Sequence, residues 1–161
     1  MGEMIKVGMG DLKACKYPDA LTTLGLGSCI GVALYDPVTK VSGLLHFMLP
    51  DSTQIRNNSN RAKFADTGIE ELLKRVIAAG ANKTRLVAKI AGGAKMFETT
   101  GVSSIGNIGA RNAEAAKQIL KQKGIRLVAE DTGLNYGRTV ELHCETGEFY
   151  IKSVGKAIKV I

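Results

Sequence analysis

Apolar residues recur along the chain with two periods, one helical and one alternating, and together these periods predict two helices among several strands. The helical period runs over residues 61–79 and 107–123, each followed by a glycine, a common helix stop. Shorter apolar runs bounded by turn residues predict strands. These runs cover residues 5–15, 29–35, 41–48, 84–90, 125–130, 138–144 and 148–154. The pattern predicts the α+β class: a layered α/β sandwich of mixed, mainly antiparallel strands with two main helices, in a single domain spanning residues 1–161.

A hairpin is predicted where two of these apolar runs are joined by turn residues that begin with Asp36. If Tyr35 and Lys40 are the last paired residues, Cys29 lies directly opposite His46. Directly opposed residues of an antiparallel pair have Cβ atoms roughly 4.5–5.5 Å apart, so a thiol and an imidazole would meet there. A one-residue slip would turn the two side chains to opposite faces.

The hydrophobic pattern argues against such a slip, because the predicted register gives one face of the hairpin a coherent apolar set. That face would hold Ile30, Val32, Leu34, Val41, Leu45 and Phe47. The other face would hold Cys29, Gly31 and Ala33 beside His46, and we expect these small residues to leave room for a ligand.

Cys29 and His46 are the candidate catalytic residues. A thiol acts as a nucleophile mainly in its thiolate form, and a neighbouring imidazole commonly lowers its pKa or takes its proton. The backbone N–H groups of Gly27, Ser28 and Cys29 are candidates for an oxyanion hole. A third group usually fixes the imidazole tautomer, and Thr23 could accept its N–H, although Thr22 competes for this role. The alternatives are a small buried cysteine, a core histidine and a β-branched strand residue.

Composition excludes several other classes of function. The hydrophobic fraction is 45%, yet no apolar run approaches the ~20 residues of a membrane helix, and the N-terminus lacks a secretory signal, so we expect a cytoplasmic protein without membrane insertion. The net charge of +7 admits an acidic partner, but Lys and Arg are scattered and aromatic residues are only 5%, so we expect no nucleic-acid binding.

Metal and cofactor sites are not predicted either. The three cysteines form no C-x-x-C pair and we expect reduced thiols, with His143 and Cys144 in structural roles. The glycine-rich segments 25–27, 92–93 and 106–109 lack a complete phosphate-binding pattern, so turns and close packing explain them better. The polar stretch 50–60 is expected to be a loop that borders the site.

The chain resembles the CheD family of bacterial chemoreceptor glutamine deamidases, through landmarks in order along nearly its whole length. They are residues 23–29 (Thr-Leu-Gly-Leu-Gly-Ser-Cys), 46–52 (His-Phe-Met-Leu-Pro-Asp-Ser), 88–97 (Ala-Lys-Ile-Ala-Gly-Gly-Ala-Lys-Met-Phe), 105–112 (Ile-Gly-Asn-Ile-Gly-Ala-Arg-Asn), and 129–133 (Ala-Glu-Asp-Thr-Gly) with 137–138 (Gly-Arg). The chain departs from the family at Leu134, where a second glycine is more usual. The resemblance implies that Cys29 is the nucleophile, that His46 is the general base and acid, and that Thr23 orients His46.

The same resemblance implies the activity and the partners. It implies hydrolysis of specific glutamine side chains on methyl-accepting chemotaxis receptors, giving glutamate and ammonia through a Cys29 thioester, without a cofactor. It also implies regulatory binding to the phosphatase CheC on the deamidase face. Two alternatives stay open: a mainly non-catalytic regulator that binds CheC and receptors, and thiol-dependent action on another acyl group, such as an ester or a peptide.

Overall fold

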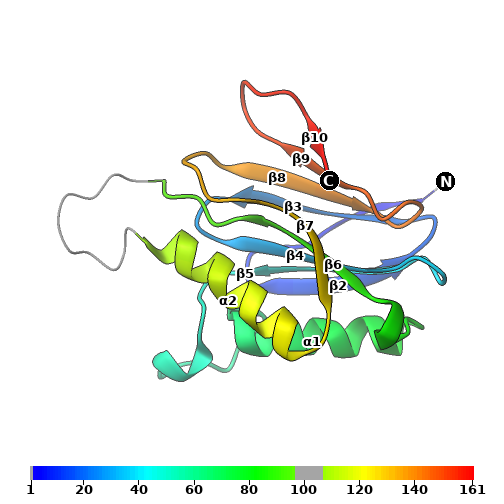
Figure 1. Cartoon of the computed structure of the whole chain (residues 1–161), viewed down its shortest axis with the longest axis horizontal. Helices are drawn as coiled ribbons and strands as arrows, with labels where there is room; N and C mark the ends of the chain where they lie inside the picture. Colours follow the sequence, from blue (N-terminus) through cyan, green and yellow to red (C-terminus); the bar gives the residue numbers. More distant parts are fainter. Residues whose placement is uncertain (1, 97–106) are drawn as a thin grey trace.

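The fold consists of two stacked β-sheets with two helices on one outer face, as the computed structural model shows (Figure 1). It describes residues 2–96 and 107–161. Phe97, Ile105 and Gly106, which belong to the sequence landmarks, lie outside the described residues. The layered α+β architecture with mainly antiparallel strands confirms the predicted fold class.

The first sheet has five strands in the order β1-β3-β8-β9-β10. The strands are β1 (Met4–Lys6), β3 (Ala20–Leu26), β8 (Arg138–His143), β9 (Phe149–Lys152) and β10 (Lys159–Val160). Strands β1 and β3 run parallel, and the other neighbours are antiparallel. A turn at residues 146–147 joins β8 to β9, with Gly147 at φ 77°, a conformation that favours glycine.

The second sheet lies between the first sheet and the helices, with strand order β2-β5-β4-β6-β7. The strands are β2 (Asp11–Lys16), β5 (Val41–Phe47), β4 (Ile30–Asp36), β6 (Val87–Gly92) and β7 (Arg126–Thr132). Strands β6 and β7 are parallel and need a crossover, which the second helix provides. The sheet is therefore mixed, as predicted.

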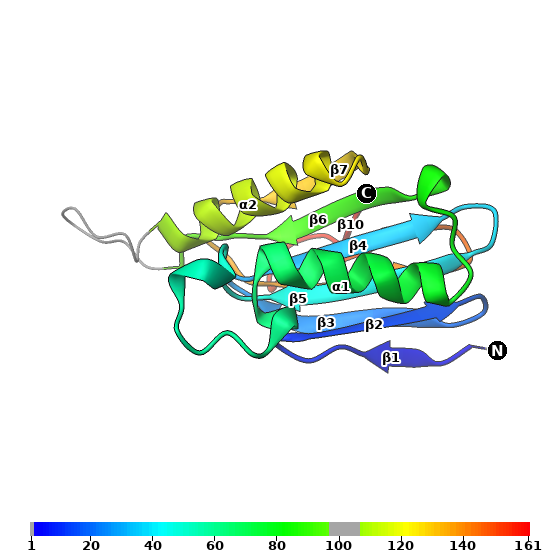
Figure 2. The ribbon, with the colours of Figure 1, turned by 90° about the horizontal axis from the view of Figure 1, so that it is seen from below.

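Helices α1 (Ala65–Ala78) and α2 (Ile108–Gln122) lie side by side across the second sheet (Figure 2). Helix α1 begins later than predicted, because residues Arg61–Lys63 form a separate 3-10 turn and Phe64 is extended. Two further 3-10 turns cover Ser52–Gln54 and Lys83–Arg85, so the predicted strand at 84–90 starts only at Val87.

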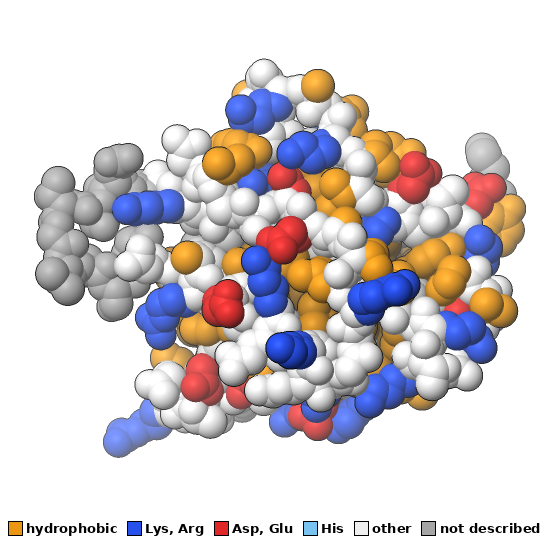
Figure 3. Space-filling view, in the orientation of Figure 1, with side chains coloured by type: hydrophobic (Ala, Val, Ile, Leu, Met, Phe, Trp, Pro, Cys, Tyr) orange, Lys and Arg blue, Asp and Glu red, His pale blue; other side chains and the backbone are white. Residues whose placement is uncertain are grey.

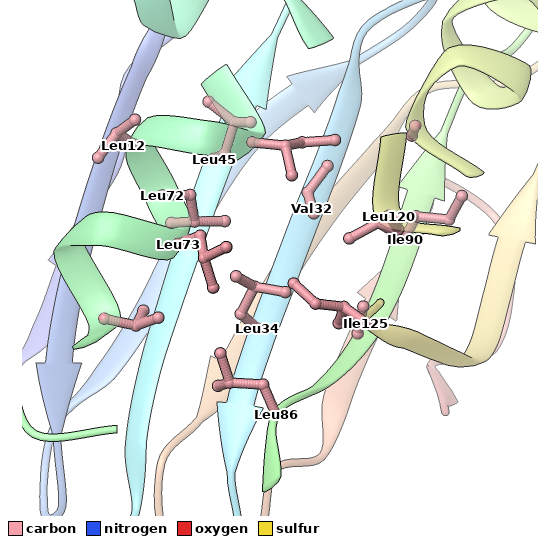
Figure 4. Packing of buried hydrophobic residues seen from close by; sticks show 14 of the residues in the cluster. Leu12, Val32, Leu34, Leu45, Leu72, Leu73, Leu86, Ile90, Leu120 and Ile125 are labelled. Atoms are coloured by element: carbon pink, nitrogen blue, oxygen red, sulfur yellow. The ribbon is translucent and has the colours of Figure 1, made fainter. Parts of the chain in front are cut away.

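Two apolar layers hold these elements together. One lies between the helices and the second sheet, where Leu72 and Leu73 of α1 and Leu120 of α2 pack over Val32, Leu34 and Ile90 (Figure 4). The other lies between the two sheets and contains Leu21, Leu26, Leu44, Val140 and Phe149. The central strands β4 and β5 of the second sheet are buried along their whole length, because both faces of this part of the sheet are covered.

The hairpin register predicted from the sequence is wrong by two residues. Asp36 pairs with Val41, so Gly31 lies opposite His46 and Cys29 precedes the first paired residue of β4. Lys40 adopts φ 61° and its N–H donates to the Asp36 carbonyl, so the loop covers residues 37–40 and lies one residue later in the chain than the predicted loop. Because side chains alternate with a period of two, this shift keeps every residue on its predicted face.

The face that carries Gly31 and Ala33 does not leave room for a ligand, contrary to the expectation. It packs against the first sheet: a Cβ on Gly31 would lie 3.1 Å from the Leu26 side chain, and Ala33 is buried.

Three strand predictions also need correction. The single strand predicted at 5–15 is two strands, which belong to different sheets and are separated by a turn that includes Gly10 at φ 67°. The full extent of β3 and the short β10 were not predicted.

The surface carries charges of both signs. On the face drawn in Figure 3, Lys and Arg side chains are interspersed with Asp and Glu rather than gathered into one patch. Among the described residues no helix is long and apolar enough to cross a membrane.

Candidate active site

The candidate residues lie at one end of the sandwich, at the left in Figure 1, where β6 ends and α2 begins. Cys29 directly precedes β4, and Gly92, the last residue of β6, pairs with Ile30. His46 is near the end of the neighbouring strand β5, while Thr23 lies on β3 of the other sheet. The site thus draws its members from both sheets.

Thr23 and His46 are joined by a hydrogen bond across the two sheets. The Thr23 Oγ1 atom lies 2.8 Å from His46 Nδ1 and 2.7 Å from the Val7 carbonyl oxygen. A hydroxyl has one proton, and a carbonyl can only accept, so the Thr23 proton goes to Val7. Thr23 must then accept the Nδ1–H of His46. The neutral imidazole consequently carries its lone pair on Nε2.

His46 Nε2 is buried and makes no hydrogen bond within residues 2–96 and 107–161. An unpaired polar atom in the interior costs free energy, and it marks a position where a proton or a substrate atom can be received. The His46 side chain as a whole is 1% exposed. Burial lowers its pKa, so the imidazole is neutral and available as a base at neutral pH.

Cys29 packs on the same inter-sheet layer that contains His46. Its side chain contacts the apolar cluster between the sheets and is partly exposed. Continuing the observed register places Cys29 opposite Met48, so His46 is its diagonal neighbour. Diagonal neighbours on one face lie within reach of a long or aromatic side chain such as imidazole.

The Cys29 pKa differs from the expectation. Burial raises the pKa of the thiol above its usual range, although a hydrogen bond from the residue's own backbone N–H opposes this effect. The structure therefore presents a neutral thiol and a neutral imidazole, rather than the thiolate of lowered pKa predicted from the sequence.

All three backbone carbonyl groups of the segment 27–29 accept hydrogen bonds from neighbouring residues. The Gly27 carbonyl accepts from Ala94 N–H at 2.9 Å, and the Cys29 carbonyl accepts from Gly93 N–H at 2.9 Å. The Ser28 carbonyl accepts from the Asn112 side chain at 2.9 Å. Each carbonyl group shares a peptide plane with the N–H of the next residue, so the bonds to the Gly27 and Ser28 carbonyls also fix the orientation of the N–H groups of Ser28 and Cys29.

Asn112 on α2 connects the two segments that carry the candidate catalytic pair. Its Nδ2 atom donates to the Ser28 carbonyl and to the Met48 carbonyl, both at 2.9 Å, and its side chain is fully buried. Both partners are acceptors, so the amide orientation is determined. Sequence reasoning included this asparagine in a landmark but gave it no role. A lone polar residue on the apolar face of a predicted helix was the available signal.

Glycine allows the end of β6 to approach this segment. Gly92 adopts φ 113°, and a Cβ there would lie 2.2 Å from the Cys29 carbonyl oxygen. The glycines at 92–93 therefore serve turns and close packing, as predicted. Behind them the buried Arg138 guanidinium pairs with Asp131 at 3.0 Å and donates to the carbonyl of Gly133.

Leu134 lies beside this region in a glycine-like conformation. Its φ is 61°, and its carbonyl accepts from Lys95 N–H at 2.8 Å. The loop therefore keeps the shape that a glycine would allow, at the cost of backbone strain in a bulky residue.

The remaining sequence candidates lie away from Cys29 and His46. Thr22 donates to the Val140 carbonyl at 2.8 Å, which removes it as the partner of His46. His143 contacts Glu141, and Cys144 is buried beside Cys15. The described part of the chain holds no group of His, Cys, Asp and Glu suited to a metal ion.

A groove elsewhere on the surface is a separate feature. It has a volume of about 590 Å³ and lies between the loop that begins at Pro50 and helix α2, with Asp51, Arg111 and Glu114 among its lining residues. Neither Cys29 nor His46 lines it.

Comparison with known proteins shows the family to which this chain belongs. A family model described as CheD chemotactic sensory transduction matches residues 48–153. A protein of Lachnoclostridium phytofermentans named probable chemoreceptor glutamine deamidase CheD is 59% identical over 161 residues, which is 100% of both chains. The chain belongs to the CheD family.

A second CheD relative agrees over almost the same length. The protein of this name from Caldanaerobacter subterraneus subsp. tengcongensis is 54% identical over 159 residues, covering 99% of this chain and 98% of its own. The family model starts after Thr23, Cys29 and His46, so only the full-length relatives span the candidate site.

A solved structure resembles this chain more distantly. It is a Neisseria meningitidis protein of the DUF152 family, with a TM-score of 0.48 and 13% identity, covering 81% of this chain and 64% of that one.

Proposed function

We propose that this chain is a protein-glutamine deamidase that converts glutamine side chains of methyl-accepting chemotaxis receptors to glutamate and ammonia. The observation that carries the proposal is the Thr23 to His46 hydrogen bond, because it leaves the imidazole lone pair on Nε2, the atom needed to accept a proton. The names of the CheD relatives support the choice of glutamine as the substrate.

In the proposed first step, His46 Nε2 takes the proton of the Cys29 thiol while the sulfur attacks the carboxamide carbon of the substrate. Because the thiol pKa is raised and the imidazole pKa is lowered in the free protein, this proton moves when the substrate is bound rather than before. The tetrahedral oxyanion would be stabilised by N–H groups of the segment 27–29, and those of Ser28 and Cys29 lie in peptide planes that are fixed by the bonds to the Gly27 and Ser28 carbonyls.

In the second step, His46 Nε2–H gives its proton to the departing nitrogen, which leaves as ammonia and creates a thioester on Cys29. Nε2 then takes a proton from water, the resulting hydroxide attacks the thioester carbon, and the Cys29 thiolate leaves and regains the proton. The products are glutamate and the free thiol. Thr23 holds the ring in one tautomer throughout.

Receptor docking would use the exposed apolar side chains at this end of the sandwich. Leu24 follows Thr23 directly and is 50% exposed, and Met96, which is 45% exposed, lies beside Gly27. Exposed apolar residues next to a reactive group are suited to contacting the apolar face of a substrate helix. We propose that the phosphatase CheC binds this same face and thereby regulates the activity, in a cytoplasmic setting.

The proposal is tested by incubating the protein with a receptor cytoplasmic fragment and measuring the gain of ~1 Da for each glutamine converted to glutamate by a Cys29 nucleophile. Wild type should convert defined glutamines, and Cys29→Ala should convert none. Equal conversion by both proteins would falsify the assignment. Cys15→Ala serves as the matched control. Cys15 pairs with Ser42, at the opposite end of β5 from His46, so the activity of this variant should match wild type.

The rival candidate is a mainly non-catalytic regulator that binds CheC and receptors. It predicts receptor and CheC binding in a pull-down with no mass gain on any glutamine. Among the described residues the buried Nε2 of His46 has no hydrogen-bond partner, and the contact with Thr23 leaves the imidazole lone pair on this atom, which supports the deamidase because such a nitrogen can take the thiol proton.

A further inference from the structure

Two thiols that the deamidase proposal does not use lie against each other between the sheets. Cys15 Sγ and Cys144 Sγ are 3.1 Å apart, and either sulfur can donate its S–H to the other. Cys15 belongs to β2 of the second sheet, while Cys144 follows β8 of the first sheet. Residues 129 positions apart in the sequence thus meet across the sandwich.

The two cysteines differ in their exposure to solvent. Cys144 is completely buried, with its backbone N–H bonded to the Asp19 carbonyl, whereas Cys15 is partly exposed. A small oxidant can therefore reach the pair through Cys15. Ser42, which pairs with Cys15 in the β2 to β5 ladder, is buried beside them.

We propose that Cys15 and Cys144 form a modification site at which a peroxide creates a reversible disulfide that links the two sheets. A disulfide needs an S–S distance of about 2.05 Å, so the two sulfurs, which are already in contact at 3.1 Å, have to approach by about 1 Å.

The reaction balances with a peroxide as the oxidant. One thiol of the pair loses its proton, and the thiolate attacks one oxygen of hydrogen peroxide, breaking the O–O bond and forming a sulfenic acid; the hydroxide that leaves takes up the thiol proton and becomes water. The second sulfur then attacks the first, its proton joins the departing hydroxyl group, and a second water leaves. Two thiols and one hydrogen peroxide thus give one disulfide and two waters.

The contact between the sulfurs favours loss of the first proton. The hydrogen bond from Cys15 lowers the pKa of Cys144, because it stabilises the thiolate form, and the pKa of Cys15 is raised in turn. The pair therefore loses its first proton more readily than a lone buried thiol does, because the remaining proton is shared between the two sulfurs.

A disulfide at this position would stabilise the fold without using Cys29. It would close a loop that contains most of the chain, and crosslinks that close long loops restrict the unfolded state most strongly. It would also join directly the two sheets that hold Thr23 and His46. The inference does not depend on the deamidase activity.

The test uses the full-length protein, treated with one equivalent of hydrogen peroxide, alkylated and digested with trypsin without reductant. The expected product is peptide 14–16 joined to peptide 139–152, with peptide 17–40 alkylated at Cys29 and the crosslink reversed by dithiothreitol. The oxidised protein should melt several degrees higher than the reduced protein, whereas Cys15→Ser and Cys144→Ser should show neither the crosslink nor the rise.

Four results would overturn the inference. They are alkylation of both Cys15 and Cys144 after peroxide treatment, a crosslink that involves Cys29, a crosslink between two molecules, and a Cys15 to Cys144 crosslink that leaves the melting temperature unchanged.

Discussion

Thr23 Oγ1 accepts the Nδ1–H of His46 at 2.8 Å while it donates its own proton to the Val7 carbonyl at 2.7 Å. The hydroxyl comes from one sheet and the imidazole from the other, so the packing of the sheets sets the tautomer of the histidine. The base of the proposed reaction is thus defined by tertiary structure rather than by a local motif.

Replacing Thr23 by Val should reduce the deamidation rate by roughly 10- to 100-fold, because the buried Nδ1–H loses its acceptor and the ring is no longer held. Thr23→Ser keeps the hydroxyl and should retain most of the activity. Rates on a receptor fragment provide the measurement. Equal loss in both variants would show that the methyl group, not the hydrogen bond, matters.

Replacing Asn112 by Asp should lower kcat more than it raises KM. The carboxylate would face the carbonyl oxygens of Ser28 and Met48, and the repulsion would displace the nucleophile segment. Gln118→Glu makes the same chemical change at an exposed position on the same helix and should leave activity unchanged. If the Asn112→Asp variant keeps the wild-type kcat and pH profile, Asn112 has no positioning role.

The pH dependence follows from the two shifted pKa values. The lowered pKa of His46 places the acid limb of kcat/KM below pH 6.5, because the base stays neutral down to lower pH than an ordinary imidazole. The raised pKa of Cys29 makes iodoacetamide labelling of the free protein slow at pH 6–7, with a rate that still increases above pH 9. Fast labelling of Cys29 at pH 6 would indicate a preformed thiolate and contradict the proposed order of proton transfer.

Arg85→Ala should lower the free energy of unfolding by about 3 kcal/mol, because it removes the cation paired with a buried carboxylate. Asp36 is completely buried and accepts two hydrogen bonds of 3.0 Å from Arg85. Burial alone would raise the pKa of Asp36, but the hydrogen bonds from Arg85 and from Asn82 N–H lower it below its usual range.

Because the Asp36 pKa is lowered by folding, its contribution to stability is present above the unfolded pKa of about 3.9 and is lost as the pH falls below it. Chemical denaturation of wild type and Arg85→Ala should therefore differ most at neutral pH and converge in acid. Arg61→Ala, which breaks two ion pairs at the surface, with Glu70 and Glu71, is the matched control and should change stability little. A gap that persists unchanged at low pH would rule out this linkage.

Leu134→Gly should stabilise the protein by about 0.5–1 kcal/mol, since relief of the left-handed strain exceeds the added flexibility of glycine in the unfolded chain. Leu134 has φ 61° and is 63% exposed, so little packing is lost. Leu134→Ala keeps a Cβ and should bring no gain. Thermal unfolding distinguishes these outcomes, and a loss of stability in the glycine variant would show that the leucine side chain contributes contacts.

The sequence predicted the layers, both helices and the faces of the hairpin, because apolar periodicity reports which side of an element is buried. Val32 and Leu34 alternate with Gly31 and Ala33, and each set lies in the layer to which it was assigned in the hairpin. The register could not be predicted as well, because it depends on the positive φ of Lys40, which turn composition does not reveal.

The candidate site was likewise predicted from the sequence only in part. The Thr23 to His46 contact was among the sequence hypotheses, and the structure brings these two residues together. The role of Asn112 depends on α2 crossing two segments that are distant in the sequence, and burial set the direction of the Cys29 pKa. Both are consequences of tertiary packing that single-sequence patterns do not contain.

The central claim is that Cys29 forms an acyl intermediate with the receptor glutamine. The most direct measurement is mass spectrometry of a receptor cytoplasmic fragment incubated with the protein in the presence of hydroxylamine, which intercepts thioesters. Wild type should yield glutamate together with glutamyl hydroxamate at the same positions, in a ratio that follows the hydroxylamine concentration, and Cys29→Ala should yield neither. Conversion by Cys29→Ala at the wild-type rate, or glutamate alone from wild type at every hydroxylamine concentration, would contradict the account.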